Sequence, residues 1–288
     1  MNVARSASEL ERVPRSVALG TFDGVHRGHQ RVIDAAVAAG PRATVVTFHP
    51  HPRTALGNLV ELLSTLERRL ELVASLGVPD TLVVEFDLDL ARLSPDEFAA
   101  RILGEIGTEI VVAGRDFRFG RGRSGDLETL ARLGFDIRPV PLVEGVSSTL
   151  IRQLVRSGEL GRAASLLGRP VEVEGTVVAG NQRGGTLGFP TANLSTDPGV
   201  MVPPHGIYAG AVGDTRAAVS IGTNPHYGGH ERRIEAFLLD FEGDLYGRRL
   251  VVELWERLRD EAVFESEEAL VEQIGRDVAR TRAAVRPV

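Results

Sequence analysis

The chain contains neither cysteine nor lysine among its 288 residues. The absence of cysteine excludes disulfide bonds, thiolate zinc sites, iron–sulfur clusters and cysteine nucleophiles. The absence of lysine excludes the P-loop lysine, the strand lysine of protein kinases and any Schiff-base enzyme. All 33 basic residues are therefore arginines, so a bound ATP would be held by arginine, histidine, hydroxyl groups, backbone N–H groups and metal.

Long hydrophobic runs are also absent. No stretch approaches the roughly 20 apolar residues that cross a bilayer, and the start, MNVARSASELERVP, lacks the apolar centre of a secretory signal. The net charge of −6 argues against a nucleic-acid binder, because such binding needs clustered positive charge. We therefore expect a cytoplasmic protein with no membrane and no nucleic-acid partner.

Strand-like runs alternate with helical patterns in the first half of the chain, which predicts an α/β domain with a parallel sheet covered by helices on both faces. One helix start is marked by a capping box of Ser94 and Glu97 with Pro95 between them. The expected helices begin after Gly28 and span 64–77 and 94–106; the expected strands are 16–20, 44–48, 80–86, 109–114 and 135–143. Ligands of such sheets bind beyond the carboxyl ends of the strands, so we expect the chemistry in the loops after 16–20, 44–48 and 109–114.

The sequence changes character near residues 168–171, after two further helical patterns at 148–160 and 161–168. From Val171 to Leu254, short β-like runs separated by glycine and proline predict an antiparallel barrel or sandwich. A last helix is expected from Ser266, as its N-cap, to about Ala284. The expected domains are 1–168 and 169–288.

The stretch LGTFDGVHRGHQRV, residues 19–32, places His26 and His29 with Gly24 and Gly28 where a strand turns into a helix. The glycines let a ligand approach the backbone, and the unpaired N–H groups and dipole of the helix attract anions. The histidines can donate hydrogen bonds to phosphate oxygens or carry positive charge as a leaving group becomes negative. The stretch therefore predicts a phosphate site.

Two other interpretations of these histidines remain open. The pair can be polar surface residues on a turn. A zinc site is the other possibility, because His49 and His51 end the next strand, although the flanking prolines stiffen that loop and no carboxylate partner is apparent.

A second glycine-rich stretch, GNQRGGTLGFPTANL at 180–194, lies in the β-rich half. Its glycines can cradle phosphates, but no Gly-Lys-Ser/Thr follows, and a tight barrel turn explains them as well. Thr191 and Asn193 lie on one face of an extended segment and offer the hard oxygen ligands that Mg²⁺ prefers.

The segment GTFDGVHRGH at 20–29 resembles the His-x-Gly-His motif of the nucleotidyltransferase superfamily, in the form found in the FMN adenylyltransferase module of bacterial bifunctional riboflavin kinase/FAD synthetases. TFHPHP (47–52), GRDFRFGRGRSGD (114–126) and VSSTLIR (146–152) match that module in the same order. The resemblance implies a Rossmann-like fold. It implies ATP-binding positions at Gly20, Phe22, Gly24, His26, Gly28, His29, Asp116, Ser148, Thr149 and Arg152. It implies flavin-binding positions at His51, Pro52, Phe117 and Phe119.

This chemistry needs no general base, because the FMN phosphate is already an anion and can attack the α-phosphorus of ATP directly. Positioning and charge suffice, with His26 and His29 as the catalytic pair and Mg²⁺ present. The chain departs from the family at His49, where an acidic residue is usual, and at Gly145, where a basic residue is frequent. Ser148 alone also fits an ordinary helix N-cap, and both roles are compatible.

The stretch GFPTAN at 188–193 resembles the signature of riboflavin kinases, and the similarity continues through HGIYAG, SIGTNPHYGG, RRIEAFLLDFEGDLYG and RLRDEAVF. It implies Mg²⁺–ATP binding by Thr191 and Asn193 and a catalytic base at Glu235, which alone would be an ordinary solvent-facing strand carboxylate. A base is needed because the ribityl 5′-hydroxyl is a poor nucleophile. Many riboflavin kinases have a histidine two residues after this glutamate, where this chain has Phe237. The implied kinase ATP site comprises Gly180, Gly185, Gly188, Thr191 and Asn193.

The resemblance covers roughly residues 16–282 and implies a bifunctional enzyme of FAD biosynthesis. Riboflavin is phosphorylated to FMN by the C-terminal module, and FMN is adenylylated to FAD and pyrophosphate by the N-terminal module. Both steps use ATP and Mg²⁺. The alternatives are an enzyme with one active module, such as a riboflavin kinase with an impaired adenylyltransferase, and a non-catalytic flavin- or nucleotide-binding regulator.

Overall fold

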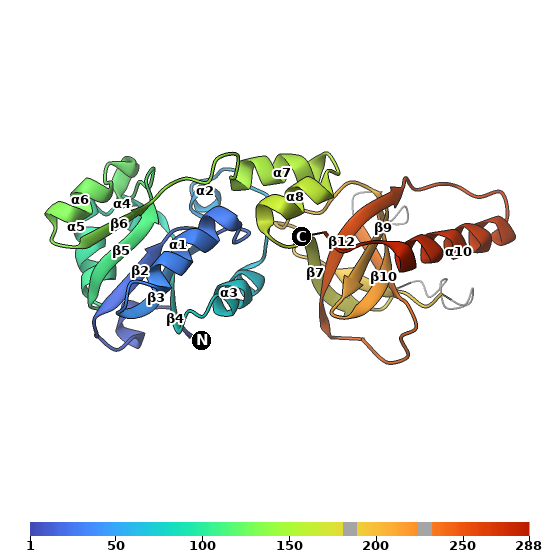
Figure 1. Ribbon diagram of the computed structural model, residues 1–288, viewed down its shortest axis with the longest axis horizontal. Helices are drawn as coiled ribbons and strands as arrows, with labels where there is room; N and C mark the ends of the chain where they lie inside the picture. Colours follow the sequence, from blue (N-terminus) through green and yellow to red (C-terminus); the bar gives the residue numbers. More distant parts are fainter. Residues whose placement is uncertain (181–188, 224–231, 288) are drawn as a thin grey trace. The chain divides into compact units, whose positions relative to one another are not determined.

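A computed structural model describes residues 1–180, 189–223 and 232–287. The chain forms two compact units, Met1–Ser148 and Thr149–Val288, drawn from blue to green and from green to red in Figure 1. None of the helices in these described ranges is long and apolar enough to span a bilayer.

The first unit is built on a six-stranded sheet in the order β1-β4-β3-β2-β5-β6, with every neighbouring pair parallel. This confirms the predicted parallel sheet. The edge strand β1 was not predicted, because three residues are too few to show a periodicity. The strands are β1 (Asn2–Ala4), β2 (Arg15–Leu19), β3 (Arg42–His49), β4 (Asp80–Glu85), β5 (Thr108–Gly114) and β6 (Asp136–Val140).

Helices connect these strands, and the expected ones are present. The capping box of Ser94 and Glu97 starts α5, which continues into a π-helical turn, η2. The helical segments of this unit are η1 (Ala7–Glu9), α1 (Arg27–Val37), α2 (Pro52–Ala55), α3 (Leu66–Ser75), α4 (Leu88–Arg92), α5 (Pro95–Phe98), η2 (Ala99–Gly104), η3 (Arg121–Arg123) and α6 (Leu127–Arg132).

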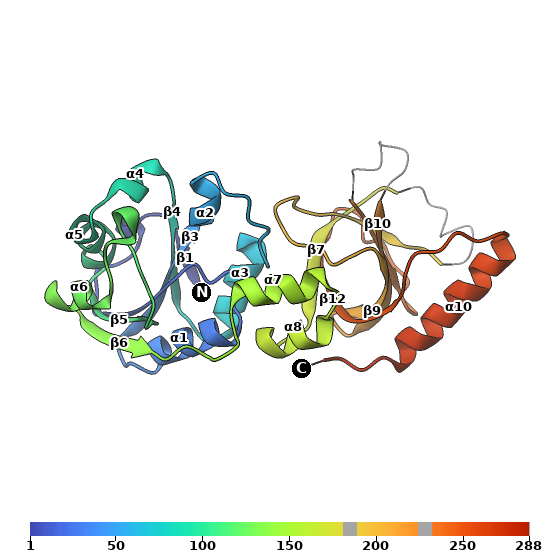
Figure 2. The same ribbon diagram turned by 90° about the horizontal axis from the view of Figure 1, so that it is seen from above.

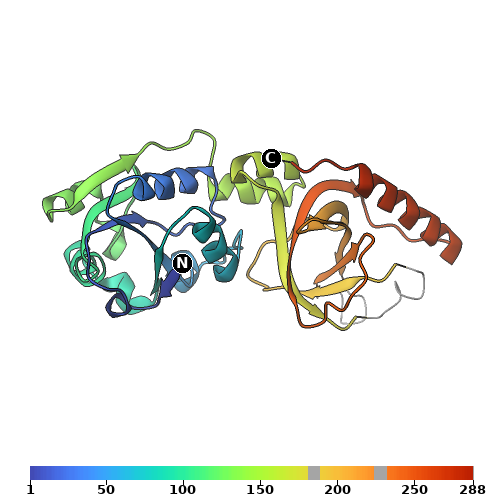
Figure 3. The same ribbon diagram turned by 60° about the horizontal axis from the view of Figure 1, so that its bottom comes forward.

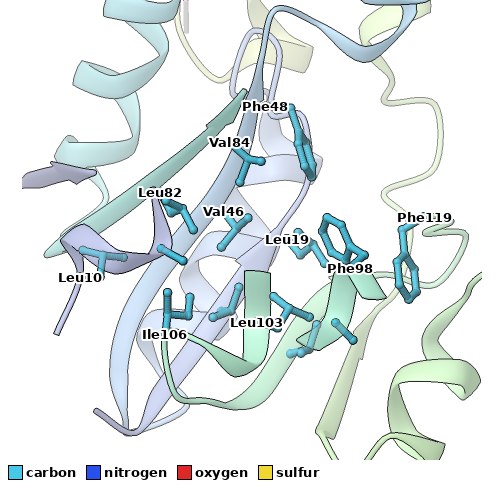
Figure 4. Close-up of a cluster of buried hydrophobic side chains, with 14 of the residues drawn as sticks. Leu10, Leu19, Val46, Phe48, Leu82, Val84, Phe98, Leu103, Ile106 and Phe119 are labelled. Atoms are coloured by element: carbon cyan, nitrogen blue, oxygen red, sulfur yellow. The ribbon is translucent and has the colours of Figure 1, made fainter. Parts of the chain in front are cut away.

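Apolar side chains that alternate along the strands fill two cores, one on each face of the sheet. On one face, Leu19 and Val46 pack with Phe98 and Leu103 of α5 and η2 (Figure 4). On the other face, the sheet packs against apolar residues of α1 and α3, among them Ala18, Val45, Val32, Ile33 and Val73. The sheet is therefore covered on both faces, as expected.

The strand order reverses at β2, which lies between β3 and β5. The chain leaves β2 toward β3 through α1 and leaves β5 toward β6 through α6. The loops after β2 and β5 therefore diverge at the carboxyl edge of the sheet, which is where doubly wound sheets bind ligands. The fold thus predicts a ligand-binding site at residues 20–26 and 115–120.

The second unit contains a closed antiparallel barrel in the order β10-β11-β8-β7-β12-β9 (Figure 3). This resolves the expectation of a barrel or sandwich in favour of the barrel. Its strands are β7 (Val171–Val178), β8 (Ala192–Ser195), β9 (Gly206–Val212), β10 (Thr215–Thr223), β11 (Arg232–Leu238) and β12 (Arg249–Arg259). Its helices are α7 (Ser148–Arg156), which begins at the last residue of the first unit, α8 (Leu160–Leu167) and α10 (Glu267–Ala283).

Helix α10 lies along the barrel beside β9 and β10 (Figure 2), and Ser266 caps it as predicted. Its buried residues are polar: Asp277 accepts hydrogen bonds from Arg259 at 2.7–3.2 Å. Arg216 donates to the carbonyl oxygens of Thr281 and Ala284, with its guanidinium carbon 5.1 Å from the Trp255 ring centroid. Arginine contacts thus hold this helix against the barrel.

A buried ion pair ties together the amino ends of the central strands of the first unit. Arg15 and Asp80 are each 1% exposed, and Arg15 Nη1 lies 2.5 Å from Asp80 Oδ2. Arg42 donates to the same carboxylate. Hydrogen bonds from Arg42 and then Arg15 hold the pKa of Asp80 below its usual range, although burial opposes them. Strands β2, β3 and β4 are thereby linked at one carboxylate.

We expect Asp80→Asn to destabilise the protein by about 3–5 kcal/mol, because it leaves the Arg15 guanidinium buried without its counter-charge. The measurement is urea unfolding followed by circular dichroism. Asp89→Asn is the matched control, since Asp89 pairs with Arg92 on the surface, and should change stability by less than about 0.5 kcal/mol. Equal unfolding midpoints for the two variants would contradict the importance of the buried pair.

Candidate functional site

The turn between β2 and α1 adopts backbone conformations that side chains rarely tolerate. Phe22 has φ 50°, Gly24 φ 77° and Val25 φ 39°. Phe22 and Val25 are nonetheless almost fully buried, at 1% and 2% exposure. Left-handed backbone at bulky residues persists only where surrounding contacts enforce it, and such strain clusters at functional sites.

The two histidines of this turn stack on each other, with ring centroids 3.5 Å apart and planes 16° apart. His26 is the N-cap of α1, and its Nδ1 accepts a hydrogen bond from the His29 backbone N–H at 3.3 Å. A Cβ at Gly28 would lie 3.1 Å from the His26 ring, and one at Gly24 would lie 2.8 Å from Leu63. Both glycines therefore make room for protein side chains.

His29 is the more exposed member of the pair, since His26 is only 6% exposed and His29 is partly buried. The Phe22 ring meets it edge-on at 5.4 Å, and a side chain at Gly20 would press on the Phe22 ring at 3.0 Å. Burial, and then the charges of His26 and Arg69, hold the pKa of His29 well below its ordinary value. His29 is therefore neutral near neutral pH and can act as a hydrogen-bond donor without carrying charge.

Ser148 is brought to the same turn. It is the first residue of α7, and its hydroxyl donates to the Asp23 carbonyl oxygen at 3.2 Å. Thr149 and the buried Arg152 follow on α7 within one turn of the helix, in the part of the chain that belongs to the second unit. Arg152 is thus about one turn of the helix after both Ser148 and Thr149.

The residues of the loop after β5 that were expected to bind ligands differ in how exposed they are. Asp116 is exposed, with its carboxylate folded over Gly114. Phe117 is partly buried and stacks on Phe119 at 5.9 Å. Phe119 is only 6% exposed and packs 5.4 Å from Phe98 in the core. Phe119 therefore supports the loop from within, while Asp116 and Phe117 are the accessible members.

The loop after β3 caps a short helix. Pro52 begins α2, and His51, which is 9% exposed, accepts the Arg53 backbone N–H at its Nδ1, 3.2 Å away. Across residues 1–180, 189–223 and 232–287, no three histidine, aspartate or glutamate side chains converge on a point that would hold a metal ion. Gly145 lies at a position where a basic residue is frequent in the family that the sequence resembles. Its φ is 68°, a conformation that favours glycine.

The second candidate cluster forms where β8 and β11 pair. Asn193 is directly opposite Glu235 in the antiparallel register, which brings their Cβ atoms to about 5 Å on one face. A Cβ at Gly180 would lie 2.2 Å from Asn193 Nδ2, so the glycine backbone packs directly on this amide. Thr191 precedes Asn193 by two residues and shares its partial exposure. Gly185 and Gly188 lie outside the described residues.

Aromatic contact supports the same face of β11. The ring of Phe237 meets Phe189 edge-on at 5.4 Å, so the residue that replaces a frequent histidine packs against the GFPTAN segment. Ile234 and Ala236 are buried on the opposite face of the strand. The oxygen-bearing side chains of Asn193 and Glu235 are thus directed away from the apolar face.

Comparison with known proteins accounts for both clusters. A family model described as FAD synthetase matches residues 9–150, and one described as riboflavin kinase matches residues 167–285. The chain is 36% identical to the bifunctional riboflavin kinase/FMN adenylyltransferase of Listeria monocytogenes, and the match covers 96% of this chain and 95% of that protein. It is 35% identical to the enzyme of the same name from Escherichia coli K12, and that match covers 98% of this chain and 97% of that protein. The chain belongs to the bifunctional riboflavin kinase/FMN adenylyltransferase family.

A solved structure from Streptococcus pneumoniae has the same architecture, with a TM-score of 0.86 and 32% identity over 97% of this chain and 98% of that one. That protein is described as a macrolide-efflux protein. The FAD synthetase match contains the His26–His29 cluster, and the riboflavin kinase match contains the Asn193–Glu235 cluster. The family's two modules therefore have one candidate cluster each. The domain boundary at 168/169 stays a prediction.

Arg69 lies in the FAD synthetase region and was missed from the sequence. It is fully buried in α3, and its Nη1 donates to the Phe48 carbonyl oxygen at 3.1 Å. Its Nε and Nη2 have no hydrogen-bond partner among the described residues, and burial lowers its pKa while the Asp23 charge opposes this shift. A signal existed: Arg69 falls three residues after Leu66 and four before Val73, on the apolar face of the expected helix.

The lowered pKa of His29 makes the stability of the first unit depend on pH. Because the unfolded state binds a proton near pH 6.5 and the folded state resists it, stability is full above this pH and falls as the pH drops below it. We expect His29→Asn to flatten this loss between pH 7 and 5. Chemical unfolding at intervals across this range measures the slope; parallel curves for both proteins would contradict a neutral His29 in the folded protein.

Proposed function

We propose that the His26–His29 cluster is the FMN adenylyltransferase site of this bifunctional enzyme and that the Asn193–Glu235 cluster is its riboflavin kinase site. The observation that carries the proposal is the register of β8 and β11, which sets a carboxylate directly opposite an amide whose position a glycine backbone fixes. ATP is the co-substrate of both reactions. A cytoplasmic location belongs to the same proposal.

In the kinase reaction, Glu235 accepts the proton of the riboflavin 5′-hydroxyl. The hydroxyl oxygen then bonds to the γ-phosphorus of ATP, the bond to the β-phosphate oxygen breaks, and ADP leaves. Thr191 and Asn193 supply a hydroxyl and an amide oxygen, a donor set that fits Mg²⁺ beside phosphates. When bound, Mg²⁺ would neutralise charge on the ATP phosphates.

In the adenylyltransferase reaction, an FMN phosphate oxygen bonds to the α-phosphorus of ATP and pyrophosphate leaves. No proton has to be removed, so the site works by alignment and by stabilising the departing charge. The neutral imidazole of His29 and the N-terminus of α1 supply hydrogen-bond donors. Ser148, Thr149 and Arg152 would add contacts to the phosphates, and Asp116, Phe117 and His51 would contribute to nucleotide and flavin binding.

Separate assays of the two reactions test this assignment. Glu235→Gln should lower kcat for FMN formation by about 10²–10⁴-fold, because the base is lost, and leave FAD formation from FMN unchanged. His29→Ala should lower FAD formation by about 10²-fold and spare FMN formation. Chromatography of FMN and FAD measures both, and equal losses of the two activities in either variant would contradict separate sites.

The packing of Gly180 on Asn193 gives a second prediction. Gly180→Ala should displace the Asn193 amide and lower kcat/KM for FMN formation by about 10²-fold, since small misplacements have effects of this size. Gly161→Ala is the matched control, because Gly161 lies in α8 with open space around it. FAD formation from FMN should survive in both variants. If the two variants form FMN equally well, the amide does not depend on Gly180.

A further inference from the structure

The carboxylate proposed as the kinase base is engaged by an arginine of its own strand. Arg233 and Glu235 are two residues apart on β11 and therefore project from the same face. Arg233 Nη2 donates to Glu235 Oε1 at 2.5 Å. Glu235 is 17% exposed and Arg233 35%, so the pair is partly shielded from water while the carboxylate stays accessible.

One further carboxylate, that of Glu261, lies near Arg233. Glu235 has Ser220 of β10 as its register partner on one side and Asn193 on the other, and neither carries a charge. Gly222, the register partner of Arg233, lies under the Glu261 carboxylate, which a Cβ at that glycine would meet at 2.1 Å. A guanidinium at position 233 is therefore near the carboxylates of Glu235 and Glu261 and, in the proposed function, near the ATP phosphates.

We propose that Arg233 is a positioning residue for Glu235 in riboflavin phosphorylation, an inference that rests on the proposed function of this site. By binding Oε1, the guanidinium restricts the rotamers of the carboxylate and leaves Oε2 for the proton of the 5′-hydroxyl. Its charge also offsets the repulsion between the Glu235 carboxylate and the triphosphate. Arg233 keeps all its protons throughout, and the only proton that moves passes from the hydroxyl to Glu235.

The test compares Arg233→Met and Arg233→Lys with Arg282→Met. The control removes an arginine from another ion pair of the same unit, since Arg282 pairs with Asp240 at 2.6 Å. We expect Arg233→Met to lower kcat for FMN formation by about tenfold to a hundredfold without changing either KM by more than about twofold. Arg233→Lys should recover part of the loss, because the charge returns without the fork geometry. The control should match the unaltered protein, and FAD formation from FMN should stay constant in every variant.

A double variant separates positioning from substrate binding. If Arg233 acts through Glu235, Arg233→Met should cause little further loss in a Glu235→Gln background. A raised KM for ATP at constant kcat would show that Arg233 binds nucleotide instead, and a raised kcat would show that it restrains the base; each overturns the inference. If Glu235→Gln loses FMN formation while Arg233→Met keeps it, only this inference is overturned. If Glu235→Gln keeps FMN formation, the proposed function is overturned as well.

Discussion

Because the chain contains no lysine, every fixed side-chain positive charge inside it is a guanidinium, and the structure is organised around that restriction. A buried lysine can lose its proton, but an arginine keeps its charge and needs acceptors in the plane of its fork. Arg15 finds them in the Ile106 and Glu11 carbonyl oxygens, the Thr44 hydroxyl and the Asp80 carboxylate. The Arg15 charge can therefore be buried only where the chain places these acceptors around the guanidinium.

Arg69 is a buried guanidinium with two nitrogens that have no hydrogen-bond partner among the described residues, and after burial and His26 its charge contributes to the lowered pKa of His29. The nearby charge opposes protonation of His29, while Asp23 compensates the arginine in part. A neutral imidazole suits a reaction that requires no base. The second site has the opposite arrangement, in which Arg233 contacts the Glu235 carboxylate, and the proposed kinase step there requires a base.

Periodicity in the sequence was sufficient to predict the central strands, α1, α3, α10 and the change to a barrel, because alternating and helical patterns record which face is buried. It was insufficient for the edge strand β1, which is defined by pairing with β4. The motif His26-x-Gly-His29 predicted a site, but neither the stacking of its two rings nor the left-handed backbone at Phe22 could be predicted from it. The family resemblance implies a flavin contact for Phe119, but its packing against Phe98 in the core depends on a residue distant in sequence and could not be predicted from the motif.

The glycines of the two motifs act through neighbouring side chains. At Gly28 the absent Cβ gives room to the His26 ring, and at Gly180 it gives room to the Asn193 amide. A glycine-rich loop read from sequence suggests backbone that cradles phosphate directly. In both clusters described here the glycine also lets one polar side chain pack against the backbone, which restricts its rotation. That side chain then stands beside the group proposed to do the chemistry, His29 in one unit and Glu235 in the other.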